Sequence, residues 1–274
     1  MSQRMRERWR ETREAFESGR YSAGGRTVDL TPHLAAMRAG VRLYRPGDAP
    51  GAPAPGGGAA TRFEVTGEST LAAAVRLAGD GPADSGRRVA ALNFASARNP
   101  GGGVADGARA QEESLARSSA LWDALVRCPD YYAHHRADRD LFYSDHVIYA
   151  PEVPVFRADD GAWLPAPVPV AFLTSAAPNR RMIERNRAGD PALVPAVLRR
   201  RAGAVLAVAA DQGARDLVLG AWGCGVFGNR PAEVAAAFAD HLHGGFAGVF
   251  HRVVFAILDR DPAVRTPFGD AFTG

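Results

Sequence analysis

The sequence predicts an α/β fold of three layers, with helices on both faces of a mixed but mostly parallel sheet. Two observations support this prediction. Short apolar runs, such as residues 89–94 and 253–258, have the length and composition of buried strands. From residue 61 onward they alternate with longer segments of helical spacing, such as residues 194–210. This alternation is typical of a parallel sheet with crossover helices.

The first part of the chain contains one low-complexity segment, residues 46–58, with the sequence PGDAPGAPAPGGG. Such a proline- and glycine-rich run predicts a loop or linker. Before it, residues 4–17 are highly charged and form a predicted surface helix that ends at Gly19. We therefore expect an N-terminal helical extension and linker over residues 1–60, and a main domain with a C-terminal tail over residues 61–274.

The main domain begins with a short strand, after which Ser69 is a favourable N-cap for the first helix. The other elements follow from apolar runs and from helical periodicity. The expected strands cover residues 63–65, 89–94, 147–149, 168–173, 217–219 and 253–258, and the expected helices cover residues 69–78, 111–127, 194–210 and 232–242.

Composition excludes several classes of function. The 33 basic and 30 acidic residues leave a net charge of only +3, too small to indicate a nucleic-acid-binding protein. Every basic residue is arginine, which excludes mechanisms that need a Schiff-base lysine or a P-loop lysine. Cys128 and Cys224 are far apart and predict neither a disulfide nor a zinc site. The sequence shows neither a membrane-length apolar run nor a signal-peptide pattern, so we expect a soluble, cytoplasmic protein.

Two glycine-rich loops each follow a predicted strand and precede a predicted helix. The first glycine loop is GGG at residues 101–103, and the second is GAWGCGVFG at residues 220–228. Glycines let backbone N–H groups approach a ligand, and a following helix N-terminus favours an anion. Either loop alone would be interpreted as a tight turn. Together, at the carboxyl ends of strands in one sheet, they predict a site for a nucleotide-like ligand with a diphosphate.

The helix after the first glycine loop begins with Gln111, Glu112 and Glu113. Adjacent glutamates on a helix usually form a solvated face. Here the first turn follows the loop directly and is expected to face the ligand. Neighbouring residues diverge by about 100° around a helix, so the two carboxylates cannot flank a glycosidic bond from opposite sides. We expect one to act on the bond and the other to hold the sugar.

The pattern of GGG, seven residues and Gln-Glu-Glu, together with GAWGCGVFGN, resembles the poly(ADP-ribose) glycohydrolases, specifically the compact bacterial type. The resemblance spans most of the chain, from about residue 27 to the last strand. It implies a macrodomain-like sheet and makes residues 61–274 the catalytic domain. Where the eukaryotic enzymes read Asp-Phe-Ala-Asn at a strand end, this chain reads Asn-Phe-Ala-Ser at residues 93–96, so one acidic side chain is absent.

The resemblance also assigns roles to single residues. Glu113 matches the catalytic glutamate of the family, and Glu112 matches the neighbour that contacts ribose hydroxyls. Phe227 matches the aromatic residue beside the distal ribose. The other residues expected to bind substrate are Asn99, Gly101, Gly102, Gly103, Val104, Gln111, Gly223, Cys224, Gly225 and Val226.

The expected function is hydrolysis of ribose–ribose O-glycosidic bonds in poly(ADP-ribose), with release of ADP-ribose and without a metal or cofactor. The expected partners are poly(ADP-ribose) and poly(ADP-ribosyl)ated proteins, with no membrane, no direct DNA recognition and a monomeric state. Two alternatives are a non-catalytic ADP-ribose-binding macrodomain and a mono-ADP-ribosyl hydrolase. His134 and His135 lack an HExxH or Cys/His pattern, and we expect them to be surface or capping residues.

The C-terminal tail follows the last predicted strand. Pro262 and Pro267 predict that it is not a regular helix, whereas Phe268 and Phe272 are expected to dock it on the body. A tail docked near the ligand loops would block the continuing polymer, with Thr266 as a wall residue. The resemblance likewise implies cleavage from chain ends.

Overall fold

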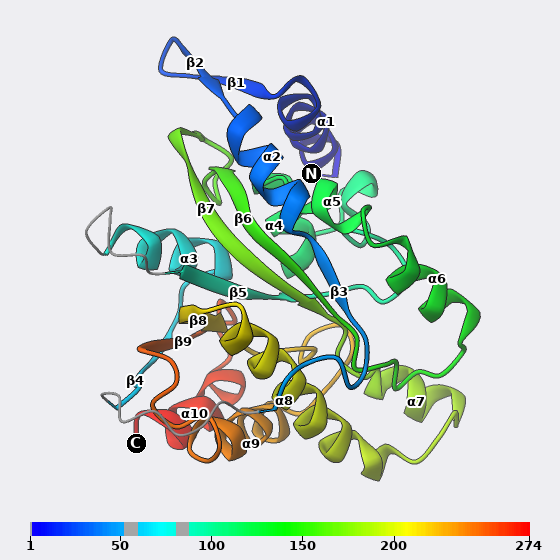
Figure 1. Cartoon of the computed structure of the whole chain (residues 1–274). Helices are drawn as coiled ribbons and strands as arrows, with labels where there is room; N and C mark the ends of the chain where they lie inside the picture. Colours follow the sequence, from blue (N-terminus) through cyan, green and yellow to red (C-terminus); the bar gives the residue numbers. More distant parts are fainter. Residues whose placement is uncertain (1, 52–59, 81–87) are drawn as a thin grey trace.

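A seven-stranded mixed sheet forms the centre of the computed structural model, which describes residues 2–51, 60–80 and 88–274 (Figure 1). The strand order is β3-β6-β7-β5-β8-β9-β4. β7, β5, β8, β9 and β4 run parallel to one another. At one edge β6 pairs antiparallel with β7, and β3 pairs antiparallel with β6. The strands are β3 (Arg42–Tyr44), β4 (Arg62–Thr66), β5 (Arg88–Phe94), β6 (Val147–Arg157), β7 (Trp163–Ser175), β8 (Ala214–Leu219) and β9 (Arg252–Ala256).

Helices cover both faces of this sheet, as predicted. Successive residues of a strand point to opposite faces, so in β5 Ala91 belongs to one apolar core and Leu92 to the other. The first core also contains buried side chains of α1 (Ser2–Ser18), α2 (Thr31–Gly40), α3 (Thr70–Gly79), α4 (Gln111–Ser118), α5 (Leu121–Leu125) and α6 (Pro129–Ala137). The second contains those of α7 (Arg180–Asn186), α8 (Val194–Asp211), α9 (Pro231–Leu242) and α10 (Pro262–Phe272).

The helix expected over residues 111–127 is interrupted, so that part of the prediction was wrong. Ser119 is extended and pairs with Val155 of β6, which separates α4 from α5. The Ser119 hydroxyl donates to the Leu115 carbonyl and accepts the N–H of Leu121. The hydroxyl and the long-range pairing thus satisfy backbone groups that a continuous helix would have used.

The prediction that the tail is not helical was also wrong, because α10 spans Pro262–Phe272. Pro262 lies in the first turn, where a backbone N–H has no helical partner, and Asp261 caps the helix. Pro267 removes one hydrogen bond inside the helix. Burial of Phe268 and Phe272 against Phe255, with ring centroids 5.3 and 4.2 Å apart, offsets that loss and docks the tail as expected.

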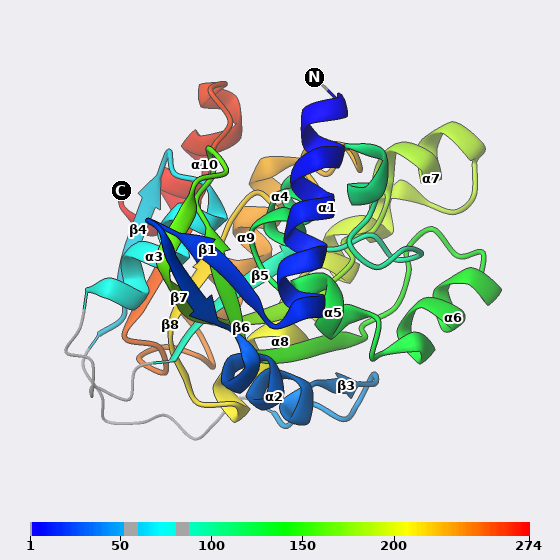
Figure 2. The same cartoon turned by 90° about the horizontal axis from the view of Figure 1, so that it is seen from above.

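The N-terminal segment packs closely on the rest of the chain. It contains α1 and a hairpin of β1 (Arg20–Ala23) and β2 (Arg26–Asp29), and in Figure 2 α1 runs alongside α4 and α5. Trp9 and Phe16 lie 5.6 and 6.1 Å from the Trp122 ring, between centroids. β3 then joins the main sheet. The division at residue 60 stays a prediction, and most of the loop expected at residues 46–58 lies outside the described residues. No helix in the described ranges is long and apolar enough to cross a membrane.

Candidate active site

A cleft of about 810 Å³ opens where the parallel strands β5, β8 and β9 end. The segments that follow these strands line it, at residues 94–99, 221–227 and 257–259. Residues 109–115, which lead into α4 and form its first turn, close one side. This is the edge at which open α/β sheets bind ligands, because the carboxyl ends of adjacent parallel strands meet there.

The cleft brings together most, but not all, of the residues expected to bind substrate. Those that line it are Asn99, Gln111, Glu112, Glu113, Gly223, Cys224, Gly225, Val226 and Phe227. Gly101, Gly102, Gly103 and Val104 lie behind Glu113 and do not line the cleft. Thr266 lines a separate hollow of about 290 Å³, together with Val65 and Arg265.

Glu112 is almost fully buried, with only 2% of its surface exposed. Its Oε2 accepts the backbone N–H of Ser96 at 2.7 Å, and its Oε1 accepts the side-chain amide of Asn93 at 3.2 Å. These hydrogen bonds favour the ionised form, but burial outweighs them and raises the pKa of Glu112 to about 8. A carboxyl group in this state can hold a proton near neutral pH.

Glu113 lies beside Glu112 in the first turn of α4 and is 7% exposed. Its Oε1 accepts the backbone N–H of Gly103 at 2.9 Å. Its Oε2 is buried and has no hydrogen-bond partner among the described residues. One oxygen of the carboxyl group is therefore held by the protein, and the other is buried without a protein partner at a residue that lines the cleft.

The first glycine loop positions Glu113, and the N–H groups of Gly102 and Gly103 donate to acceptors within the protein. The N–H of Gly102 donates to the Asn99 carbonyl, and that of Val104 donates to the Gly101 carbonyl. Gly102 has a φ of +58°, and a Cβ there would lie 2.4 Å from Glu113 Oε1. The position therefore requires glycine both for its backbone conformation and for the carboxylate packed against it.

Gln111 connects α4 to the end of β5. Its Oε1 accepts the N–H of Phe94 at 2.8 Å, and its Nε2 donates to the Leu92 carbonyl at 2.8 Å and to Thr70 Oγ1 at 3.1 Å. Three hydrogen bonds fix this side chain to the strand and to α3. Gln111 thus sets the position of the helix turn that carries both glutamates.

The second glycine loop presents consecutive backbone donors to the cleft. The N–H groups of Gly225, Val226 and Phe227 have no acceptor among the described residues, and the Val226 side chain is 68% exposed. By contrast, the N–H of Cys224 donates to the Ala221 carbonyl. Such a run of unused N–H groups is suited to an anionic ligand.

Close packing fixes the base of this loop. A Cβ on Gly223, whose φ is +73°, would lie 2.4 Å from Asn229 Nδ2. Asn229 donates to the Pro178 carbonyl at 3.0 Å, which ties the loop to the segment after β7. Burial raises the pKa of the Cys224 thiol to about 12, so this cysteine is protonated at neutral pH and is not an activated nucleophile.

Several residues that line the cleft were not predicted from sequence. Tyr143 has a φ of +57° and packs against Phe227, with ring centroids 6.0 Å apart. At another edge, Ser69 donates to Asp159 Oδ2 at 2.6 Å, and both line the cleft. The irregular segments around Tyr143 and Asp159 carry no periodic pattern. A positive φ at a non-glycine residue is visible only in the structure.

We expect replacement of Glu112 by glutamine to raise thermal stability at alkaline pH. Folding raises the pKa of Glu112, so the folded protein binds this proton more tightly than the unfolded chain does. The resulting contribution to the free energy of unfolding is complete below the pKa of the unfolded chain and is lost as the pH rises through the pKa of the folded protein. The Tm of Glu112→Gln should therefore exceed that of the unmodified protein at pH 8–9, and the difference should shrink toward pH 5. The matched control is Asp106→Asn, at an exposed carboxylate nearby. A Tm difference that stays constant over this range would contradict the raised pKa.

The chain matches the family model described as microbial-type PARG, catalytic domain, over residues 10–158. It is 52% identical to the poly(ADP-ribose) glycohydrolase (PARG) of Thermomonospora curvata, with a TM-score of 0.92 and coverage of 98% of this chain and 100% of that one. A second structure of that protein, bound to the inhibitor ADP-HPD, gives 50% identity, a TM-score of 0.87 and the same coverage.

A third similar structure is the PARG of Deinococcus radiodurans in complex with ADP-ribose, with 43% identity, a TM-score of 0.79 and coverage of 88% of this chain and 97% of that one. No match was found among curated proteins. The family model covers more than half of the chain, and the Thermomonospora curvata structures cover 98% of it. The chain therefore belongs to the family of microbial-type poly(ADP-ribose) glycohydrolases.

Proposed function

We propose that this protein hydrolyses the ribose–ribose O-glycosidic bonds of poly(ADP-ribose) and releases ADP-ribose. The observation that carries the proposal is the pair of buried glutamates in the first turn of α4. Both line the cleft at the carboxyl end of the sheet. Family membership supports the same reaction. A pure binding module would not need a buried carboxyl group with an unpartnered oxygen.

Glu113 is the proposed general acid and base. Its Oε1 is held by the N–H of Gly103, so Oε2 is the oxygen that faces substrate. Glu113 protonates the leaving ribose oxygen while positive charge develops on the anomeric carbon, and the resulting carboxylate then takes a proton from the attacking water. Glu112 accepts hydrogen bonds from ribose hydroxyls. No step of this mechanism uses a metal or a cofactor.

The rest of the cleft positions the nucleotide part of the substrate. The free N–H groups at residues 225–227 bind the diphosphate, and the guanidinium groups of Arg98 and Arg109, which also line the cleft, complement its charge. The apolar side chains of Phe94, Ile257 and Leu258 line the same cleft and offer a surface for the base.

Cleavage from polymer ends is part of the proposal. One side of the cleft is bounded by Leu258 and Asp259, which precede α10, and by Val264 in its first turn. This segment takes the role of the wall that was expected from the tail, although Thr266 itself lines the neighbouring hollow. A wall here would stop a polymer from continuing through the cleft in that direction.

The proposed setting is the cytoplasm, with the protein acting as a monomer on poly(ADP-ribosyl)ated proteins. Both cysteines are free, which suits a reducing compartment. The net charge of +3 is too small to indicate a basic surface for DNA.

Incubation with purified poly(ADP-ribose), followed by chromatography of products over time, tests this function. ADP-ribose should be the dominant early product if cleavage starts from the ends. Early accumulation of oligomers would contradict end-directed cleavage. Binding without turnover would identify an ADP-ribose-binding module, and turnover of mono-ADP-ribosylated protein alone would identify a mono-ADP-ribosyl hydrolase.

Replacement of Phe227 by alanine is expected to lower turnover more than it lowers the affinity for ADP-ribose. The ring is half-buried against Tyr143 at the cleft wall, where it would position the scissile ribose. We expect a loss in kcat of about tenfold or more. Leu193→Ala, at an apolar side chain that is 54% exposed away from the cleft, is the control. The role fails if titration shows a collapse of ADP-ribose affinity while the rate at saturating polymer is unchanged.

A further inference from the structure

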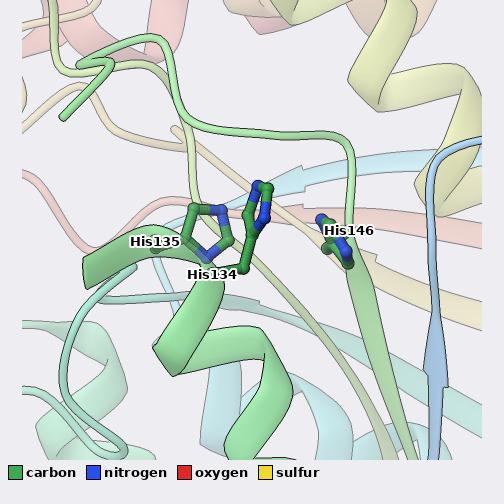
Figure 3. Close-up of side chains that lie close together, drawn as sticks. All are labelled: His134, His135 and His146. Atoms are coloured by element: carbon green, nitrogen blue, oxygen red, sulfur yellow. The ribbon is translucent and has the colours of Figure 1, made fainter. Parts of the chain in front are cut away.

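Three histidines outside the cleft lie close together, although only two are adjacent in sequence (Figure 3). His134 and His135 lie in the last turn of α6, and His146 precedes β6. One ring nitrogen from each lies within 4.8 Å of the other two. The ring centroids are separated by 5.1, 4.7 and 5.8 Å. Three imidazoles around one tetrahedral ion, at metal–nitrogen distances of about 2.0–2.1 Å, have centroids about 5 Å apart.

The hydrogen bonds of the two buried rings leave a nitrogen lone pair on each. His135 Nδ1 lies 2.8 Å from the Tyr131 carbonyl, which can only accept, so the proton is on Nδ1 and the lone pair is on Nε2. Ser144 Oγ lies 2.7 Å from that Nε2 and 2.6 Å from His146 Nδ1. If its single proton goes to His135 Nε2, Ser144 accepts the Nδ1–H of His146, and the lone pair of the neutral His146 ring is then on Nε2.

Metal-binding histidines have this arrangement, because the second ring N–H is usually fixed by a backbone carbonyl or another polar group. A lone pair is present on each ring only if both rings are neutral. Burial acts in the same direction, since it lowers the pKa of His135 to about 4 and that of His146 below its ordinary value. Neutral imidazole is the form that binds a metal ion.

We propose that His134, His135 and His146 form a binding site for a divalent transition-metal ion, with Zn²⁺ as the best fit. Three neutral nitrogen donors suit Zn²⁺ and its neighbours and do not suit Mg²⁺ or Ca²⁺, which prefer oxygen. On binding, the Ser144 hydroxyl leaves His135 Nε2 and continues to accept the N–H of His146. Water completes the tetrahedral shell. This site is separate from the proposed hydrolytic chemistry.

The site would stabilise a segment that contributes to the cleft. Tyr143, whose ring borders the cleft beside Phe227, precedes Ser144 directly and packs edge-on against His135, with ring centroids 5.8 Å apart. An ion held by α6 and by the residue before β6 would fix both ends of this segment. Since only the folded protein assembles the three ligands, Zn²⁺ should raise the Tm.

The test is calorimetric titration of the untagged, chelator-treated full chain with Zn²⁺, together with thermal melts. We expect one Zn²⁺ per chain and, at about 100-fold excess over Kd, a rise in Tm of about 5 °C or more. Co²⁺ should bind with the visible absorption of a tetrahedral complex. His134→Ala and His146→Gln should each weaken Zn²⁺ binding by about tenfold or more. The control, His33→Gln, changes a histidine outside the cluster and should bind normally.

His134 is exposed, so its replacement leaves the fold intact and decides the result even if His146→Gln is unstable. The proposal is overturned if the protein does not bind Zn²⁺, if His134→Ala binds it as well as the unmodified chain, or if His33→Gln weakens binding equally.

Discussion

Glu113→Gln is expected to lower the turnover of poly(ADP-ribose) by about 10²–10⁴-fold, the loss typical of a positioned general acid and base. Glutamine keeps the size of the side chain, and its carbonyl oxygen can still accept the N–H of Gly103. It cannot deliver a proton from the position of Oε2, which is the buried oxygen without a partner among the described residues. The measurement is the rate of ADP-ribose release at saturating polymer.

Binding separates this chemical role from a structural one. The affinity for ADP-ribose should stay close to that of the unmodified protein, because the donors at residues 225–227 are unchanged. Glu14→Gln, at an exposed glutamate of α1, is the matched control and should leave turnover unchanged. Turnover of Glu113→Gln within a few-fold of the unmodified protein would remove Glu113 from the mechanism. A parallel loss of turnover and affinity would indicate a binding role instead.

The sequence predicted the local part of this site and the type of fold. Glu112 and Glu113 were expected at the site because a predicted helix begins seven residues after the first glycine loop, and the structure places both at the cleft where β5 ends. The α/β class followed from the alternation of apolar runs with helical segments. Such apolar runs are typical of strands that are buried on both faces of a sheet. Such features depend on neighbours in the chain, so a single sequence contains them.

The features that the sequence did not predict depend on long-range contacts. Ser119 interrupts a helical pattern because its backbone pairs with β6. α10 forms despite Pro267 because Phe268 and Phe272 become buried. Tertiary packing outweighs local propensity in both cases. The two glycine loops also could not be told apart from the sequence. The N–H of Gly103 is used because the fold places Glu113 beside it, and the sequence does not show this distance.

Gly102→Ala is expected to reduce turnover by about 10²-fold, although residue 102 does not line the cleft. The new Cβ would lie 2.4 Å from Glu113 Oε1 and 3.2 Å from Glu112 Oε2. The carboxyl group of Glu113 must therefore move, and it loses the position set by the N–H of Gly103. A displacement of about 1 Å at a reacting group is sufficient for a loss of this size.

The backbone strain of this change can be separated from its effect on Glu113. Gly102 has a φ of +58°, so alanine there should also lower the free energy of unfolding by about 1–3 kcal/mol. Gly25 is a matched control, because its φ is +75° and a Cβ there meets nothing within 4 Å. Gly25→Ala should lose stability to a similar extent, as measured by denaturant unfolding, and keep full turnover. If Gly102→Ala also kept full turnover, the close approach of residue 102 to Glu113 would have no part in positioning the carboxyl group.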